Sequence, residues 1–144
     1  VVPDQTRRDM QLTVLQTCGL RQEVAANSIL KSALHRAEPS AQSLADVAAP
    51  TGFVHGYDLG RVLIAAARQA QSQSEWDGQS IEAMRAALRS ALLALDAPVD
   101  GILKRYAPPF SPNSADKADG HEALSIDDFC LARFRQDGRL EHAH

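Results

Sequence analysis

The chain opens with alternating apolar and polar side chains. Over residues 10–17 (MQLTVLQT) every second position is apolar, which predicts a β-strand that ends before Gly19. A helical period follows over residues 22–37 and predicts an α-helix. A short helix over residues 43–48 comes next, and the Pro-Thr-Gly sequence at 50–52 marks a break.

The two strongest helical patterns lie in the middle of the chain. Residues 57–70 carry apolar side chains at i, i+3, i+4 and i+7, which predicts an amphipathic helix. A polar loop at residues 71–79 separates it from a second helix, which Ser80 caps. The positions expected to face the core are Leu59, Val62, Leu63, Ala66 and Ala70 in the first helix and Ile81, Met84, Leu88, Leu92 and Leu95 in the second.

The remaining third predicts strands and loops. Residues 99–106 can hold one short strand, and residues 108–120 form a loop rich in proline and serine. Another strand is predicted over residues 125–135, and a turn at 136–138 allows residues 139–142 to return as its hairpin partner. The fold class is therefore α/β. Because the strands are widely separated in sequence, we expect them to need partners from a larger fold.

Composition and charge exclude one class of partner. The chain has 144 residues, of which 44% are hydrophobic, and its formal net charge is -3. Those values are ordinary for a globular domain. Nucleic-acid binders usually carry a basic stripe, and no such stripe is present, so we expect no nucleic-acid partner. No internal repeat and no domain linker divides the sequence.

Two cysteines, Cys18 and Cys130, have no metal-type spacing. One interpretation is a disulfide, formed if the fold brings their strands together in an oxidising compartment. The other interpretation is a pair of buried thiols that act as small hydrophobic side chains. The residues alone leave both open.

No catalytic constellation is visible. The sequence lacks a glycine-rich phosphate loop and a nucleophile elbow. Asp127 and Asp128 are adjacent on a predicted strand, so they point to opposite faces and do not share a site. His142 and His144 are better explained as a terminal tail than as a chelating pair. We expect no enzyme activity, cofactor or metal. Among the histidines only His55 stands out, between the break and the first strong helix.

A family resemblance begins at TGFVHGYDLGRVLIAAARQA, residues 51–70. This stretch resembles the long helix near the C-terminus of the periplasmic solute-binding proteins of branched-chain amino-acid-type ABC transporters. The order of the following segments is similar too: an amphipathic helix, then APVDGILKRY, an irregular loop and DDFCLARFRQDGRL. The resemblance covers nearly the whole chain, from about residue 10 to residue 140.

The resemblance implies a two-lobed fold of which this chain is one part. The family has two α/β lobes joined by crossover strands, with the ligand in the cleft. Residues 1–144 resemble a single segment, the C-terminal third. About 10–49 and 107–144 would belong to the second lobe and 50–106 to the first lobe, so the chain gives helices and strands to both. The rest of the same protein, or a second copy, would complete the fold. This placement also favours the Cys18–Cys130 disulfide.

The function implied by the resemblance is solute binding without chemistry. The chain would belong to a periplasmic component of an ABC importer, which binds a small amino-acid-like or carboxylate solute by lobe closure and docks on a membrane permease. The ligand contacts implied at segment ends are Gln16, Thr17, Phe53, His55 and Tyr57. Phe53 or Tyr57 would supply an apolar wall, and Thr17 or His55 would donate to a carboxylate. For each residue, packing or helix capping is the competing explanation.

Two other functions stay open at this point. A ligand-sensing module of the same fold would couple closure to a signalling partner instead of a permease. A small helical protein-interaction domain would need an exposed apolar stripe, which Leu88, Leu92 and Leu95 can furnish.

Overall fold

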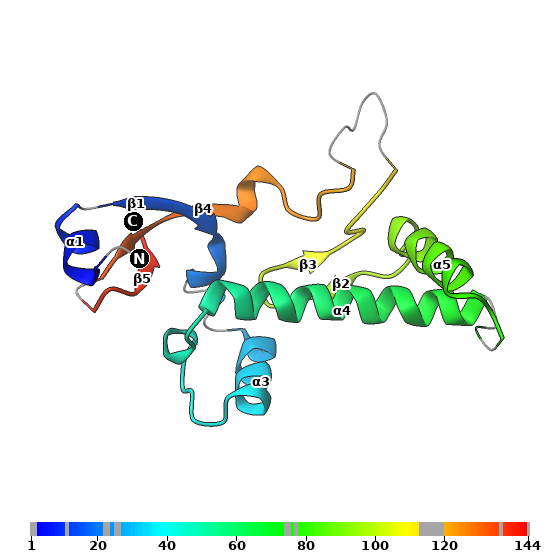
Figure 1. The fold of residues 1–144 in the computed structure, drawn as a ribbon, viewed down its shortest axis with the longest axis horizontal. Coiled ribbons are helices and arrows are strands. Elements are labelled where there is room, and N and C mark those ends of the chain that lie inside the picture. The colour runs from blue at the N-terminus through cyan, green and yellow to red at the C-terminus, as the bar shows by residue number, and fades with distance from the viewer. Residues whose placement is uncertain are drawn as a thin grey trace. The chain divides into compact units, whose positions relative to one another are not determined.

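The protein has a mixed α/β fold, as the sequence predicts (Figure 1). The computed structural model describes residues 3–10, 12–21, 24, 27–73, 76, 78–112, 120–135 and 137–143. The helices and strands run in the order α1 (Asp4–Asp9), β1 (Thr13–Thr17), α3 (Ser28–Ala37), α4 (Pro50–Gln73), α5 (Ile81–Leu93), β2 (Val99–Asp100), β3 (Arg105–Tyr106), β4 (Phe129–Phe134) and β5 (Leu140–His142). Within this part of the chain, no helix combines the length and the apolar character that crossing a bilayer requires.

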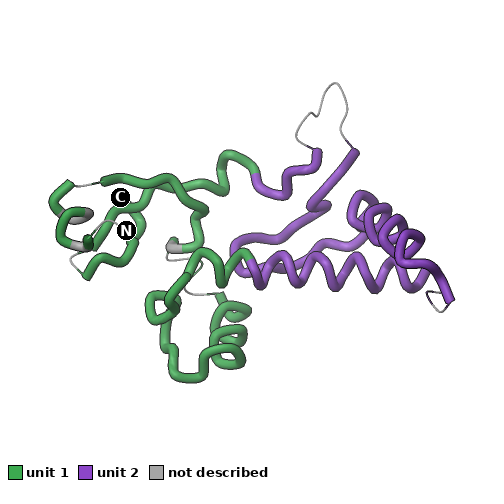
Figure 2. The backbone as a smooth tube through the Cα atoms, in the orientation of Figure 1, with its two compact units in different colours: residues 1–55, 125–144 green, residues 56–124 purple. Residues whose placement is uncertain are grey.

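The chain divides into two compact units (Figure 2). Unit 1 contains residues 1–55 and 125–144, and unit 2 contains residues 56–124. Unit 1 is therefore discontinuous in sequence. The chain leaves it inside α4 and returns to it just before β4.

Unit 1 is built on a three-stranded antiparallel sheet in the order β1-β4-β5. Leu15 lies opposite Leu131, and Thr17 lies opposite Phe129, at the end of the β1 ladder. The turn between β4 and β5 contains Gly138 with a φ of 78°, the left-handed region that glycine adopts without a Cβ clash. The hairpin predicted for residues 139–142 is confirmed.

A disulfide joins the first strand region of unit 1 to the fourth strand. Cys18 and Cys130 are bonded, with their Cα atoms 5.0 Å apart and a sequence separation of 112. Cys18 opens the short 3-10 helix Cys18–Leu20 directly after β1, and Cys130 lies within β4. Both cysteines are buried. The bond therefore links the two sequence segments of unit 1, which are separated in sequence by the whole of unit 2.

In the described part of unit 2, side chains from α4, α5 and the β2–β3 hairpin form an apolar core. Seven buried side chains make up this cluster: Val62, Ala66, Ala70, Ala91, Leu95, Val99 and Tyr106. The single tryptophan, Trp76, is partly buried against it. Gln69 of α4 also ties down the segment after α5, because its amide donates to Ala94 O at 2.7 Å and accepts from Asp96 N at 3.2 Å.

The helix predicted over residues 57–70 is longer at both ends than its apolar period indicates. α4 begins at Pro50, so interpreting residues 50–52 as a break was wrong. Proline fits the first turn of a helix, where no intrahelical partner for its missing N–H exists. The helix also continues to Gln73, into the stretch predicted as a loop.

Three other predicted elements differ from the structure. The single strand over residues 99–106 is a hairpin, since β2 and β3 pair with Val99 opposite Tyr106. The strand over 125–135 begins only at Phe129, after the 3-10 helix Ile126–Asp128. The short helix predicted over residues 43–48 is reduced to one 3-10 turn, Leu44–Asp46.

Smaller differences concern the first third of the chain. The predicted helix over residues 22–37 is described from Ser28 as α3, and most of 22–26 lies outside the described residues. Asn27 caps α3, because its side chain accepts from Ile29 N at 2.8 Å. β1 begins at Thr13 rather than Met10. The helix α1 was not predicted, because it is short and mostly polar.

Not every predicted core position is buried. Val62, Ala66, Ala70 and Leu95 are buried as predicted. Leu59, Leu63 and Ile81 are exposed instead, although the same helical pattern marks them as inward-facing. The apolar stripe of α4 is therefore wider than the face that the core of unit 2 covers.

Candidate functional site

The end of β1 and the start of α4 meet within unit 1. Thr17 Oγ1 and His55 Nε2 are 2.7 Å apart and share a hydrogen bond, whose donor depends on the imidazole tautomer. Thr51 Oγ1 donates to Gln16 Oε1 at 3.3 Å. Three of the predicted ligand-binding residues, Gln16, Thr17 and His55, are thus brought together. We call these three and Thr51 the polar cluster.

Helix geometry explains why two helix residues reach the same strand end. Thr51 and His55 are four residues apart on α4, so their side chains lie on one face of the helix. Both positions are half-buried, and Thr17 is buried. Thr51 was not among the predicted site residues. Its i, i+4 spacing to His55 is the signal that identifies it, once the helix is known to begin at Pro50.

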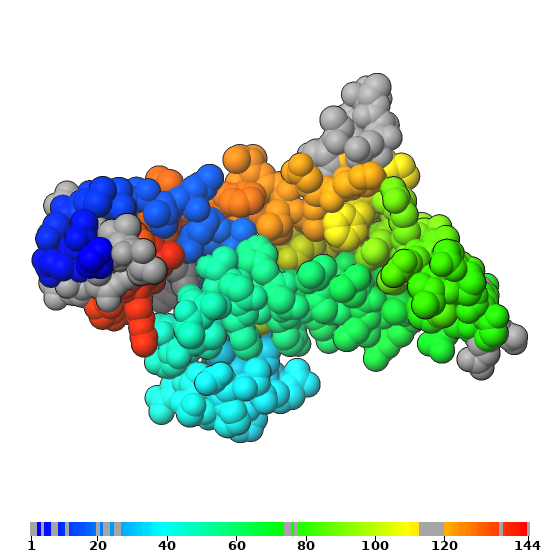
Figure 3. Space-filling view, viewed as in Figure 1, coloured from blue at the N-terminus to red at the C-terminus, as the bar shows by residue number. Residues whose placement is uncertain are grey.

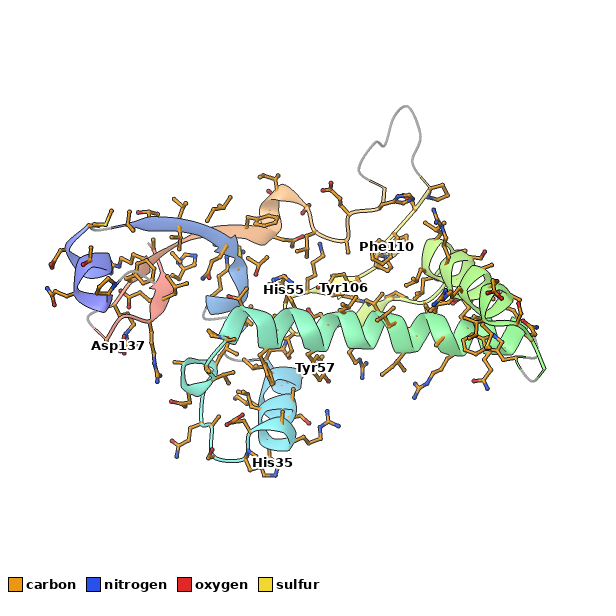
Figure 4. All side chains as sticks on the ribbon, in the orientation of Figure 1. His35, His55, Tyr57, Tyr106, Phe110 and Asp137 are labelled. Atoms are coloured by element: carbon orange, nitrogen blue, oxygen red, sulfur yellow. A yellow bond between two sulfur atoms is a disulfide. The ribbon has the colours of Figure 1, made fainter. Side chains whose placement is uncertain are left out.

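The two predicted aromatic residues do not join the polar cluster. Phe53 and Tyr57 are each two positions from His55 on α4, which places them roughly 200° around the helix from it. Figure 4 shows His55 and Tyr57 on opposite sides of the α4 ribbon. Both aromatic side chains are half-buried. The five predicted residues therefore form two groups: Gln16 and Thr17 of β1 meet His55 on one face of α4, and Phe53 and Tyr57 lie on another face of that helix.

The polar cluster brings several hydrogen-bonding side chains together. It offers two hydroxyls, an amide and an imidazole, each of which can donate or accept. Cys18, the residue after Thr17, offers no free thiol to the cluster, because it is held in the disulfide. Four polar groups close together can hold the carboxylate, amine or amide of a small solute.

Unit 1 also contains a pocket of about 290 Å³, which lies between the segment that leads into α4 and the β4–β5 hairpin. Its walls include Val47 and Pro50 from the segment that leads into α4, and Phe134, Arg139 and Leu140 from the β4–β5 hairpin. None of the five predicted ligand-binding residues lines it. Arg139 also donates to the carbonyl of Ala45 on the pocket wall.

Two exposed carboxylates beside helix starts have lowered pKa values. The side-chain and backbone hydrogen bonds of Ser43, followed by that of Gln42, lower the pKa of Asp46. The pKa of Glu82 is lowered by hydrogen bonds from its own backbone N–H and from Ser80. Ser80 caps α5 as predicted, because its Oγ accepts from Ala83 N at 3.2 Å. These shifts reflect capping, and neither carboxylate belongs to the polar cluster.

The buried carboxylate Asp58 is a feature that sequence reasoning missed. In unit 2 its Oδ1 accepts from Ile102 N at 2.5 Å, and its Oδ2 accepts from Leu103 N at 3.0 Å and Tyr106 Oη at 2.9 Å. Asp58 is only 3% exposed. Since both oxygens are occupied by donors from the β2–β3 hairpin, the arrangement is that of a structural staple rather than of a catalytic acid.

Gly101, next to this staple, has no room for a side chain. A Cβ at Gly101 would lie 2.6 Å from the carboxyl carbon of Asp58. The backbone of the hairpin turn therefore lies directly against the carboxylate.

Metal chemistry finds no support in the residues that the structure describes. Among them, no group of three or more His, Cys, Asp and Glu side chains is placed to hold an ion. His144 lies outside the described residues. Comparison with models of protein families, with curated proteins and with solved structures finds nothing that matches this chain.

Proposed function

We propose that the chain is part of a periplasmic solute-binding component of an ABC importer. In this proposal it binds a small amino-acid-like or carboxylate solute by lobe closure, does not transform it, and docks on a membrane permease. The rest of the fold is supplied by the remainder of the same protein or by a second copy. The proposal combines the family resemblance that begins at residues 51–70 with the structure of the described residues.

One observation carries the proposal: unit 1 is built from both ends of the chain, and unit 2 is inserted between them. A chain that passes between two compact bodies more than once is typical of binding proteins whose lobes close on a ligand. A stand-alone helical interaction domain does not need that connectivity. The boundary after residue 55 falls near the one that the resemblance implies at about 50, whereas the boundary after residue 124 lies well beyond the implied one at about 106.

Two further features support solute binding in an oxidising compartment. The polar cluster places hydrogen-bond donors and acceptors at a strand end and a helix start, where small-molecule contacts are common. The Cys18–Cys130 disulfide fits an extracytoplasmic location, since disulfides persist where thiols are not kept reduced.

The proposal is tested by a two-dimensional ¹⁵N–¹H NMR titration of the 144-residue chain with L-leucine, L-phenylalanine, succinate and acetamide. We expect one or more of these solutes to give saturable shifts of the Gln16, Thr17 and His55 amides. A concentration limit of about 10 mM covers dissociation constants well above the micromolar range. Absence of shifts at these three amides with all four solutes would refute the assignment of the polar cluster to solute binding.

Matched histidine variants separate binding from nonspecific effects. His55→Ala removes one member of the polar cluster and is expected to weaken binding by about tenfold, the loss typical of a hydrogen bond to a charged ligand group. His35→Ala changes an exposed histidine of α3 in the same unit and is expected to leave binding unchanged. Equal losses in the two variants would contradict the proposed contact.

A further inference from the structure

Helix α4 presents an apolar face that the core of unit 2 does not cover. Leu59 is 55% exposed, Leu63 38% and Ile64 52%. They lie on adjacent turns of one helix, so they form a continuous patch rather than scattered residues. α4 lies uncovered along part of its length in the space-filling view (Figure 3). A contiguous exposed apolar patch of this kind marks an interaction site.

Two glycines beside these residues leave room for a close approach. Gly56 and Gly60 lie in the helix interior, where glycine is less stable than alanine. Among the described residues, a Cβ at either position would meet no atom within 4 Å, so no described neighbour explains the glycine. Gly60 lies between Leu63 and Ile64 around the helix. The backbone of α4 is therefore accessible at the centre of the patch.

A pocket of about 220 Å³ borders the patch within unit 2. Arg61, Ile64 and Arg68 line it from α4, and Pro98 and Val99 line it from the segment entering β2. Pockets for complete small ligands usually measure about 300–1,000 Å³. This smaller pocket is of a size to accept one apolar side chain of a docked polypeptide.

The charge beside the pocket is positive, because two arginines of α4 line it. Arg61 and Arg68 are seven residues apart, which places them within roughly 20° of each other around α4 and about 10 Å apart along it. Within the residues that the structure describes, neither guanidinium has an ion pair or a hydrogen bond. Asp58, the one acid of α4, is buried in the hairpin staple. Charge complementarity therefore calls for carboxylates on the partner.

We propose that this surface, the α4 outer face (Leu59, Gly60, Arg61, Leu63, Ile64 and Arg68), docks an acidic amphipathic helix of a partner protein. Apolar side chains of the partner would cover the three exposed aliphatic residues and fill the pocket, while its carboxylates pair with the two arginines. A second copy of this chain fits less well, because symmetric pairing would bring the same arginines together. This inference does not depend on solute binding.

The test uses three fluorescein-labelled helical peptides and the 144-residue chain, with binding followed by fluorescence anisotropy. The first peptide has leucine at i, i+3, i+4 and i+7 with glutamate at the flanking positions. The second has lysine in place of every glutamate, and the third has serine in place of every leucine. We expect the first peptide to bind at least about tenfold more tightly than either of the others.

Charge-reversal variants locate the surface. R61E/R68E is expected to weaken binding of the acidic peptide by about tenfold and to strengthen binding of the lysine peptide. R85E/R89E reverses two exposed arginines of α5 and is expected to change binding by less than about twofold. Ile64→Ser is expected to weaken binding about fivefold, whereas Ile81→Ser, at a position of α5 that is 60% exposed, leaves it unchanged. Circular dichroism is the control that checks whether each variant is folded.

Several results would overturn the inference. Equal losses in R61E/R68E and R85E/R89E would mean nonspecific electrostatic attraction. Binding of the serine peptide as tight as that of the leucine peptide would remove the role of the apolar residues. Displacement of the peptide by free glutarate at equal concentration would assign the arginines to a small dianion. A dimer in sedimentation equilibrium that Leu63→Asp dissociates would assign the face to a second copy.

Discussion

Removal of the buried carboxylate of Asp58 should strongly destabilise unit 2. Asp58→Ala removes the carboxylate that accepts from three donors: Ile102 N, Leu103 N and Tyr106 Oη. Each unsatisfied buried donor costs about 1–3 kcal/mol. Water can enter the vacated space and recover part of that loss, so we expect about 3–5 kcal/mol in total. Against the roughly 5–15 kcal/mol of a typical domain, this is a large fraction.

Trp76 supplies the assay, because it is the single tryptophan and is partly buried against the core cluster of unit 2. Urea unfolding followed by tryptophan fluorescence reports on this unit. With a slope of about 1.5–2 kcal/mol per M, the loss at Asp58→Ala should lower the midpoint by roughly 2 M.

Three companion variants make the outcome decisive. Tyr106→Phe removes one hydrogen bond to a charged group and should cost about 1.5 kcal/mol, and nearly nothing in the Asp58→Ala background. Asp100→Ala removes an exposed acid whose carboxylate is 3.6 Å from Arg105, and should cost less than about 0.5 kcal/mol. If Asp58→Ala shifts the midpoint no further than Asp100→Ala, the staple does not stabilise unit 2. If Asp58→Ala does not fold, the ranking of Tyr106→Phe over Asp100→Ala decides the question.

Three further predictions concern other parts of the chain. Reduction of the Cys18–Cys130 bond, which closes a loop of 112 residues, should destabilise unit 1 by about 3–5 kcal/mol; unchanged hydrogen-exchange protection of the β1 and β4 amides would contradict this. Gly101→Ala should lower the urea midpoint of unit 2, since its Cβ would lie 2.6 Å from the Asp58 carboxyl carbon, and an unshifted midpoint would show that the carboxylate moves freely. Ser43→Ala should raise the pKa of Asp46 towards its ordinary value, as measured by carboxyl ¹³C NMR titration. Because the folded pKa is the lower one, the stabilisation from this carboxylate is present above about pH 4 and is lost as the pH falls through the folded pKa.

The periodic part of the sequence predicts the middle of the fold well and its helix boundaries poorly. Val62, Ala66 and Ala70 are buried at the predicted spacing, because one face of α4 covers the core of unit 2. The start of α4 was missed because Pro50 and Gly52 usually break helices, although proline is tolerated in a first turn. Sequence patterns show which residues are breakers, but only tertiary packing decides whether a helix starts or stops there.

The residues of the candidate site were also predicted only in part. Gln16, Thr17 and His55 meet as hydrogen-bonded neighbours, whereas Phe53 and Tyr57 lie on another face of the same helix. The helical period alone separates the two groups, once residues 50–57 are known to be helical. Which strand end faces the helix depends on contacts between residues far apart in sequence, and no local pattern records those contacts.

The disulfide in unit 1 and Asp58 in unit 2 each fasten together segments that are distant in sequence. Each unit takes about half of the 144 residues, a size at which one hydrophobic core leaves little stability to spare. Unit 1 must hold together two segments from opposite ends of the chain, and a covalent bond over 112 residues removes most of the loop entropy that opposes this. Unit 2 is one continuous segment, and a buried carboxylate fastens its helix α4 to a hairpin 44 to 48 residues later. Reduction should therefore act on unit 1 and Asp58→Ala on unit 2. Exchange protection in β1 and β4 and fluorescence of Trp76 follow the two effects independently, and a loss of both signals in either experiment would show that the units unfold as one.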